Sequence, residues 1–363
     1  MSPEISPSQR EDPVIEMLRG LAACMVVGTH YASMVATHPG LWGFASTGVD
    51  LFFVLSGYVF APYLHGRPLA TLPHLVRRFF RLVPLYWTAL ACYLLLSSLQ
   101  GRAMLYVPEH FLFLHTARSL EIATYYNSAF WSLPPEVEFY LVLPILAWAA
   151  TRWRLAWGVA LAVAMHLALV AAADPASQAV TARAIATIHL PGLLCEFALG
   201  AMAWHLVQTA PGGKQRALRL VLGLLALAAT MALFHAFIAD TGAQRDPAPL
   251  WIGGNMGLLA ATAYALLVSA VAGAPGAARQ VPLAAFWFWL GQCSYGVYLL
   301  HNASPQALQL LGWKPQGWAG ILACILLTLC AAWMAHKAIE HPMRTWGRRI
   351  SLRWQARPRP AQG

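Results

Sequence analysis

Two residues that can do acid–base and anion-binding chemistry lie in one apolar stretch, IEMLRGLAACMVVGTHYASMV. Arg19 and His30 are eleven positions apart, which places them on one face of a helix and about 16 Å apart along its axis. Imidazole can serve as a general base near neutral pH, or as a nucleophile. The spacing predicts a cationic anchor at the helix start and a reactive group deeper along it. The alternative is a histidine that only bonds a neighbouring helix.

Carboxyl groups occur in two further apolar stretches. Asp50 lies in STGVDLFFVLSGYVFAPYL, where it could orient an imidazole or bind a sugar hydroxyl. Glu136 and Glu138 follow Pro134 and Pro135, which are residues typical of a helix start. The helix dipole favours carboxylates in a first turn, so a capping role is the alternative for all three. Two positions are about 200° apart on a helix, so we expect Glu136 and Glu138 to face different sides.

A dense basic cluster consists of Arg77, Arg78 and Arg81. Basic residues beside membrane helices orient them and contact anionic lipid headgroups. Three arginines within five positions exceed what orientation needs, and guanidinium groups bind phosphate well. We therefore expect a phosphorylated cytoplasmic ligand to dock at this cluster.

The composition identifies the elements that must position these residues. The chain has 363 residues, of which 59% are hydrophobic and only 10% are charged, against about 25% charged in soluble proteins. This excludes a disordered chain, a disulfide-rich secreted module and an ordinary soluble enzyme. The six cysteines form no CxxC pair, so neither a disulfide framework nor a metal site is expected.

We expect an all-α polytopic membrane protein with about ten transmembrane helices, because a spanning helix takes about 20 apolar residues. The third and fourth stretches are separated by a long segment, 100–133, with a short apolar piece around Phe111 to Leu114. The ten apolar stretches are 16–37, 46–65, 82–99, 134–150, 155–173, 184–207, 218–239, 251–272, 283–302 and 318–338.

The distribution of basic residues predicts the topology. With the N-terminus inside, 19 of the 24 Lys and Arg residues fall on the cytoplasmic side, as the positive-inside rule requires. Both termini are therefore predicted to be cytoplasmic. The net charge of +10 is then explained by topology and does not indicate nucleic acid. We expect a polar cytoplasmic tail (1–14), a membrane domain (15–345) and a basic cytoplasmic tail (346–363).

No GxSxG elbow, Walker A loop, HExxH motif or strand-linked GxGxxG occurs. Hydrolase, nucleotide-driven pump and metalloprotease functions therefore have no support.

Several segments together resemble the acyltransferase-3 family of integral membrane acyltransferases. Arg19 and His30 match its first-helix signature, GVDLFFVLSGYVF is similar to its second-helix motif, and RRFFRLVPLYW resembles its basic cytoplasmic motif before the third helix. FWSLPPEVEFYLVLP is similar to its Trp-Ser-Leu and glutamate segment, with Glu136 at the recurrent glutamate. CEFALG with Glu196, SYGVYLLH with His301 and IEHP with Glu340 are weaker similarities. The matches run in order from about 13 to 345. Glu340 and Arg344 are also i,i+4 partners near the cytoplasmic face, a pair that we expect to be structural.

The resemblance implies transfer of an acyl group, usually acetyl, from cytoplasmic acyl-coenzyme A to a hydroxyl of a glycan or glycolipid. It implies a stand-alone enzyme of the bacterial inner membrane, with acyl-coenzyme A as co-substrate and no permanently bound cofactor. His30 would be the base or a transient acyl carrier, and Asp50 and Glu136 would orient it or hold the acceptor. The donor would dock on Arg19, Arg77, Arg78 and Arg81. Weaker candidates for substrate binding are Trp131, Ser132, Glu138, Glu196 and His301.

Two other functions fit the same residues. Buried carboxylates and histidines also form proton relays, so a transporter or flippase of a lipid-linked sugar or proton-coupled solute is the main alternative. A non-catalytic scaffold for envelope enzymes is the other, and it predicts that the Arg77–Arg81 cluster can be neutralised without loss of function.

Overall fold

The computed structural model of the chain describes residues 12–36, 40–150, 155–172, 185, 188–239, 250–274 and 276–355. Within these ranges the secondary structure is helical and contains no strand. The predicted class is confirmed: this is an all-α polytopic membrane protein. The outer parts of both predicted tails lie outside the described residues, as do the predicted loop positions Arg152, Arg154, Arg183 and Arg245. The side on which the termini lie stays a prediction.

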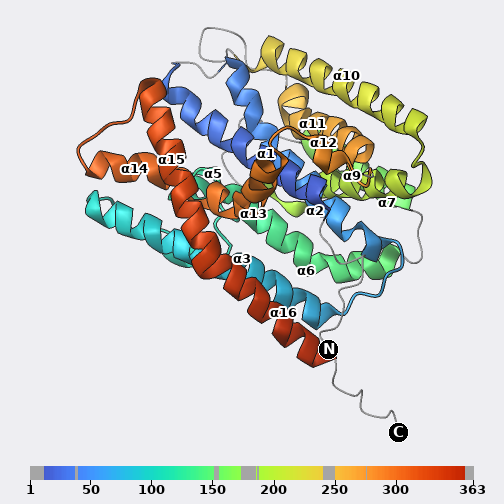
Figure 1. Cartoon of the computed structure of the whole chain (residues 1–363), viewed down its shortest axis with the longest axis horizontal. Helices are drawn as coiled ribbons and strands as arrows, with labels where there is room; N and C mark the ends of the chain where they lie inside the picture. The colour runs from blue at the N-terminus through green and yellow to red at the C-terminus, as the bar shows by residue number, and fades with distance from the viewer. Residues whose placement is uncertain are drawn as a thin grey trace. The chain divides into compact units, whose positions relative to one another are not determined.

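Within the described residues, each of the ten predicted apolar stretches overlaps a helix of the structure (Figure 1). Parts of the stretches 16–37, 155–173 and 184–207 lie outside those residues. Among the described residues, seven helical segments are long and apolar enough to cross a membrane. Those seven contain α2 (Gly48–Leu64), α3 (Thr71–Leu99), α6 (Leu133–Ala150), α9 (Leu190–Thr209), α10 (Gly213–Phe237), α11 (Leu250–Val271) and α15 (Gly317–Ala335). The other three predicted stretches correspond to α1 (Pro13–Tyr31), α7 (Leu155–Ala171) and α13 (Ala284–Leu300).

The predicted start of one helix was wrong, and the error concerns the segment that carries the basic cluster. The third stretch was predicted to begin at residue 82, yet α3 begins at Thr71 and has 29 residues. The basic cluster therefore lies inside this helix and not in a segment before it. Arginine is a good helix former, and its long apolar stem can lie along a helix while the charge reaches polar surroundings.

The segment between α3 and α6 folds into short helices. These are α4 (Val107–Phe111), α5 (Leu120–Thr124) and the 3-10 helix η4 (Phe130–Ser132). Two buried histidines hold it together, because the ring Nε2 of His110 donates to the Ile122 carbonyl (2.9 Å) and that of His115 donates to the Phe130 carbonyl (3.0 Å). Their rings stack with centroids 4.3 Å apart. Burial lowers the pKa of His110 to about 3 and also lowers that of His115.

The chain forms two compact units. Unit 1 contains residues 1–32, 38–61 and 196–294, and unit 2 contains residues 33–37, 62–195 and 295–363. The shorter elements of unit 1 are the 3-10 helix η3 (Gly40–Thr47) and α12 (Ala277–Gln280). Unit 2 also contains α14 (Ala303–Leu310), the π-helix η5 (His336–Glu340) and α16 (His341–Gln355), and the 3-10 helix η2 (Ala32–Met34) lies at the boundary between the two units in the sequence.

The core of unit 1 is built from α1, α2, α9 and α11, and many of its buried residues are alanines. Small residues let membrane helices approach closely, which is how such helices gain packing energy in lipid. The start of α1 is capped by Asp12, whose carboxylate accepts from the Val14 backbone N–H (2.9 Å). The same carboxylate accepts from the Gly273 N–H (2.9 Å) and so ties α1 to the end of α11.

In unit 2, α15, η5 and α16 form one continuous helical segment from Gly317 to Gln355, and α16 lies along α3 (Figure 1). Gly347 faces Phe80, and a Cβ at Gly347 would lie 2.5 Å from the Phe80 Cβ. Arg77 donates to the Ser351 hydroxyl (3.3 Å). The first ten residues of the predicted C-terminal tail, 346–355, are thus helical and lie along the helix that carries the basic cluster.

Candidate functional site

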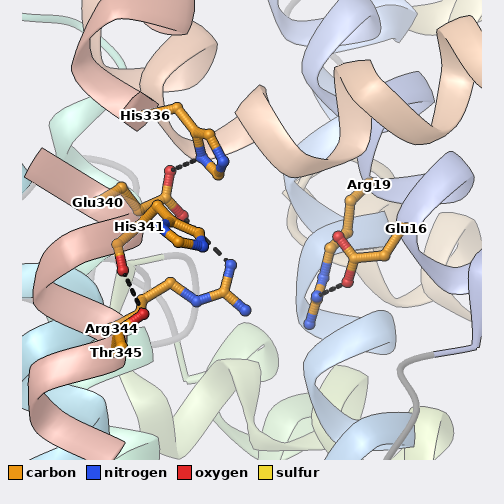
Figure 2. Close-up of polar contacts among 7 residues, drawn as sticks. All are labelled: Glu16, Arg19, His336, Glu340, His341, Arg344 and Thr345. Atoms are coloured by element: carbon orange, nitrogen blue, oxygen red, sulfur yellow. Dashed lines mark hydrogen bonds and ion pairs between the residues drawn. The ribbon is translucent and has the colours of Figure 1, made fainter. Parts of the chain in front are cut away.

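Arg19 and His30 both lie on α1, as predicted. Arg19 is largely buried and forms an ion pair with Glu16 one turn earlier (Figure 2). An anionic ligand at Arg19 would therefore share this guanidinium with Glu16. This pairing was not predicted, although the i,i+3 spacing of an acidic and a basic residue is visible in the sequence.

The ring of His30 is oriented by its own helix. Its Nδ1 lies 2.8 Å from the Val26 carbonyl oxygen. A carbonyl can only accept, so Nδ1 is the protonated nitrogen, and Nε2 of the neutral ring carries the lone pair. This is the tautomer that a base or a nucleophile acting through Nε2 requires.

Asp50 is hydrogen-bonded to Glu196, and these two residues are named the acid pair here. Asp50 lies in the first turn of α2, and Glu196 lies on α9 with only 1% of its surface exposed. The Glu196 Oε2 atom is buried without a hydrogen-bond partner, so the bond to Asp50 runs through Oε1. A hydrogen bond between two carboxyl groups needs one proton between them. The acid pair therefore holds at least one proton.

Glycines let the helices that carry the acid pair approach each other closely. A Cβ at Gly57 of α2 would lie 1.9 Å from the Phe197 carbonyl oxygen, and one at Gly200 of α9 would lie 2.0 Å from the Val54 carbonyl oxygen. On the third helix, α11, a Cβ at Gly257 would lie 2.7 Å from Asp50 Oδ1 and 2.9 Å from Glu196 Oε1. Gly57 and Gly200 thus allow the close approach of α2 and α9, and Gly257 leaves room for the two carboxyl groups of the acid pair.

In unit 2 the basic cluster adjoins a tyrosine–glutamate pair. The guanidinium of Arg78 lies over the Tyr140 ring, 5.5 Å from its centroid. The Tyr140 hydroxyl donates to the Glu136 carboxylate one turn earlier on α6. Arg81 also interacts electrostatically with Tyr140. Cations that suit phosphate and a predicted catalytic carboxylate therefore belong to one polar network.

An apolar cavity of about 340 Å³ lies between α3 and α6 beside this network. Arg78 and Tyr140 are its polar lining residues, and the remaining ones are aliphatic or aromatic. The volume is at the lower end of the range for small-ligand sites, about 300–1,000 Å³.

Glu138 faces a different side of α6 from Glu136, as predicted. It accepts from the His189 ring Nδ1 (3.2 Å) and from the Leu190 backbone N–H (2.9 Å). The hydrogen bond that His189 donates to Glu138 raises the pKa of His189. Glu138 thus anchors the start of α9, and a substrate would have to displace these contacts.

The other weaker candidates lie in unit 2 as well. The Ser132 hydroxyl is buried and 2.6 Å from the Tyr298 hydroxyl. The Nδ1 of buried His301 donates to the Tyr298 carbonyl (2.8 Å). Trp131, in the 3-10 helix before α6, keeps partial exposure. Ser132 and His301 thus form part of the packing around Tyr298, while Trp131 remains available for contact.

The structure gives Glu340 a second partner besides Arg344, namely His336. Glu340 is 2% exposed, and its Oε2 accepts from the His336 Nδ1 at 3.0 Å, whereas Arg344 is farther away at 3.8 Å (Figure 2). Only the Glu340–Arg344 pair had been predicted. The i,i+4 spacing of His336 and Glu340 was the available signal.

The three predicted catalytic residues belong to different units. His30 and the acid pair lie in unit 1, together with Arg19, whereas Glu136 and the basic cluster lie in unit 2. Among the residues that the structure describes, no group of three or more His, Cys, Asp or Glu side chains could hold a metal ion.

The chain resembles known proteins along most of its length. Residues 12–337 match the acyltransferase domain of the acyltransferase-3 family, a match that ends before Glu340. The chain is similar to the peptidoglycan O-acetyltransferase OatA of Listeria monocytogenes (24% identity, 94% of this chain and 57% of the relative). It is also similar to nodulation protein 10 of Rhizobium leguminosarum (26% identity, 94% of this chain and 96% of the relative). The chain thus spans little more than half of the Listeria protein. No solved structure matches.

Proposed function

Because the chain belongs to the acyltransferase-3 family, we propose that it transfers an acetyl or other acyl group from cytoplasmic acyl-coenzyme A to a hydroxyl of an envelope glycan or glycolipid. The resemblance of the individual motifs is thereby supported by a match over most of the chain. A bacterial inner-membrane location belongs to the same proposal, since both relatives are bacterial proteins.

The observation that carries the proposal is the polar network of unit 2. A coenzyme A thioester has several phosphate charges, and guanidinium groups bind phosphate with strong charge-assisted hydrogen bonds. The basic cluster supplies three such groups on one helix, and Arg78 lies on Tyr140, which binds Glu136. Donor binding and a carboxylate for catalysis are thus joined within one unit.

His30 supplies the reactive nitrogen in this proposal. Its Nε2 lone pair accepts the proton of the acceptor hydroxyl while that oxygen attacks the acyl carbon. The C–O bond forms, the C–S bond breaks with its electron pair on sulfur, and the thiol finally receives a proton. Alternatively, Nε2 itself takes the acyl group and passes it to the hydroxyl. Both routes require the tautomer that the Val26 carbonyl imposes.

The carboxyl groups hold the acceptor. With a proton on one of its two carboxyl groups, the acid pair can both donate to and accept from a sugar hydroxyl, and it lies in the same unit as His30. The Glu136 carboxylate, held by Tyr140, is the second such group.

The direct test is label transfer. Envelope membranes containing the protein are incubated with radiolabelled acetyl-coenzyme A, and ester-linked label in glycan and lipid fractions is measured after release with mild base. His30→Ala should abolish transfer while the protein stays in the membrane. His235→Ala, at an exposed histidine of α10, is the matched control and should retain transfer. Unimpaired transfer by His30→Ala would remove His30 from the mechanism.

The basic cluster is tested by its effect on the donor. Replacing Arg77, Arg78 and Arg81 with glutamine should raise KM for acetyl-coenzyme A at least tenfold and leave KM for the acceptor unchanged. Arg349→Gln, at an exposed position on α16, is the control. An unchanged donor KM would contradict the docking role and favour the scaffold. Solute flux without any acyl donor would favour the transporter.

A further inference from the structure

The segment from Gly317 to Gln355 contains one π-helical turn, η5, just before a proline. Pro342 has no N–H, and its ring would clash with the carbonyl four residues earlier in a regular α-helix. The wider turn relieves this clash, and the His341 N–H bonds instead to the His336 carbonyl five residues back. Single π-turns inside long helices are frequently found at functional sites.

The π-turn brings a histidine and a glutamate into register. His336 Nδ1 lies 3.0 Å from Glu340 Oε2 (Figure 2), and both residues are buried, at 7% and 2% exposure. Because a carboxylate accepts, Nδ1 carries the proton and Nε2 of the neutral ring is the basic nitrogen. This is the arrangement by which a carboxylate orients a catalytic imidazole.

Several charged groups surround the His336–Glu340 dyad. On the same helical segment, Arg344 lies 3.8 Å from Glu340, and the His341 ring is 6.2 Å from the His336 ring. The helix α3 packs against η5 and carries the basic cluster. From α13, Tyr295 interacts electrostatically with both Glu340 and Glu136, which lies on α6. The dyad thus adjoins the helix that is proposed to bind the donor.

We propose that His336, oriented by Glu340, delivers a proton to the sulfur of the acyl donor as the thioester breaks. This inference rests on the proposed function. The dyad belongs to the same unit as the basic cluster, and α3 connects the two. A protonated His336 has hydrogen on both nitrogens, so Nδ1 keeps its bond to Glu340 while Nε2–H is free to be donated.

The step balances without any further reactant. The C–S bond breaks, its electron pair stays on sulfur, and the Nε2 proton passes to sulfur to give the thiol. His336 is then neutral. It is reprotonated as the acceptor hydroxyl releases one proton, so the number of protons is conserved. The net reaction remains thioester plus alcohol giving ester plus thiol.

The first experiment measures kcat and KM for acetyl-coenzyme A in proteoliposomes. His336→Gln should lower kcat about 100-fold or more, the usual contribution of general acid–base catalysis, with little change in donor KM. Glu340→Gln should cause a smaller loss, because the neutral amide can still accept from Nδ1. His341→Gln, at an exposed residue on the same helix, is the matched control and should behave like wild type.

The second experiment separates proton delivery from a packing role. S-acetyl para-nitrothiophenol releases a weakly basic thiolate that needs no proton to depart. With this donor the ratio of wild-type to His336→Gln rates should fall towards one, whereas His30→Ala should remain inactive. Added imidazole should partly restore His336→Ala with acetyl-coenzyme A, which it would not do for a misfolded variant.

The outcomes separate the two proposals. If wild type transfers acetyl and His336→Gln does so at the same rate, the inference fails and the proposed function stands. An equal loss with both donors and no response to imidazole would assign the dyad a packing role and overturn the inference. If wild type transfers no acyl group from any thioester, the proposed function itself fails.

Discussion

Replacing Gly57 with alanine should disrupt the crossing of α2 and α9. The added Cβ would lie 1.9 Å from the Phe197 carbonyl oxygen. Carbon–oxygen contacts begin near 3.3 Å, so the helices must separate by about 1.4 Å. Gly200 meets the Val54 carbonyl at 2.0 Å, so the crossing is equally close from both sides and cannot be relieved by a side-chain rotation.

The separation should affect both stability and activity. Overpacking of this kind typically costs about 1–3 kcal/mol, and backbone is the clashing atom here, so we expect about 3 kcal/mol. The acid pair bridges the same two helices, and a misplacement of about 1 Å can lower a rate about 100-fold. Gly57→Ala should therefore lower kcat/KM by about that factor as well as the thermal unfolding midpoint.

The assay combines thermal unfolding in detergent with acetyl-transfer kinetics. Gly253→Ala is the matched control, because it lies on α11 of the same unit and its Cβ would meet nothing within 4 Å. Inside a helix this change should stabilise by about 0.5–1 kcal/mol. Wild-type stability and rates for Gly57→Ala would refute the close crossing of α2 and α9.

Three further predictions concern single sites. Gly257→Ala places a Cβ 2.7 Å from one oxygen of Asp50 and 2.9 Å from one oxygen of Glu196. It should lower kcat about tenfold with little change in the unfolding midpoint. An unaltered kcat would contradict the proposed role of the acid pair. His110 is buried in its uncharged form, and its pKa is lowered to about 3, against about 6.5 in the unfolded chain. The stability that neutral His110 gives the folded protein is therefore fully present above about pH 6.5 and is lost as the pH falls towards 3. His110→Gln should flatten the decline of the unfolding midpoint on acidification, and an unchanged slope would count against this. The pKa of His189 shifts in the opposite direction, because its hydrogen bond to Glu138 raises it. His189→Gln should therefore lower the unfolding midpoint more at about pH 5.5 than at about pH 9. Equal losses of the midpoint at the two pH values would exclude a charged contact between His189 and Glu138.

The boundary of α3 shows where sequence patterning fails. Hydropathy predicted a start at residue 82, because the basic cluster before it was placed on the cytoplasmic side, ahead of the apolar stretch. The helix begins at Thr71, since arginines are compatible with helix and α16 packs along this part of α3. Hydropathy detects the segment in contact with lipid, whereas a helix that continues beyond that segment is stabilised by neighbours that the local sequence does not reveal.

The partners of the candidate residues show the same limit. Asp50 was predicted to orient an imidazole or to bind a sugar hydroxyl, and the structure adds a hydrogen bond to Glu196, from a distant part of the chain, that the sequence did not indicate. Glu340 was predicted to pair with Arg344 four residues on, and it does so at 3.8 Å, but its closer partner is His336, at 3.0 Å. A one-dimensional pattern gives the face of a helix, but the hydrogen-bond partner depends on the local pitch and on which helix crosses at that level.

The sequence by itself determined the class of protein, the positions of its apolar helices and the short list of polar residues that lipid would otherwise exclude. Those properties depend on local composition, because a spanning helix satisfies its own backbone hydrogen bonds. Only the tertiary structure decided that Asp50 and Glu196 are hydrogen-bonded, that glycines bring α2 and α9 into backbone contact, and that a π-turn aligns His336 with Glu340. These arrangements depend on packing between segments far apart in the chain, where displacements of about an ångström decide whether two polar atoms form a hydrogen bond.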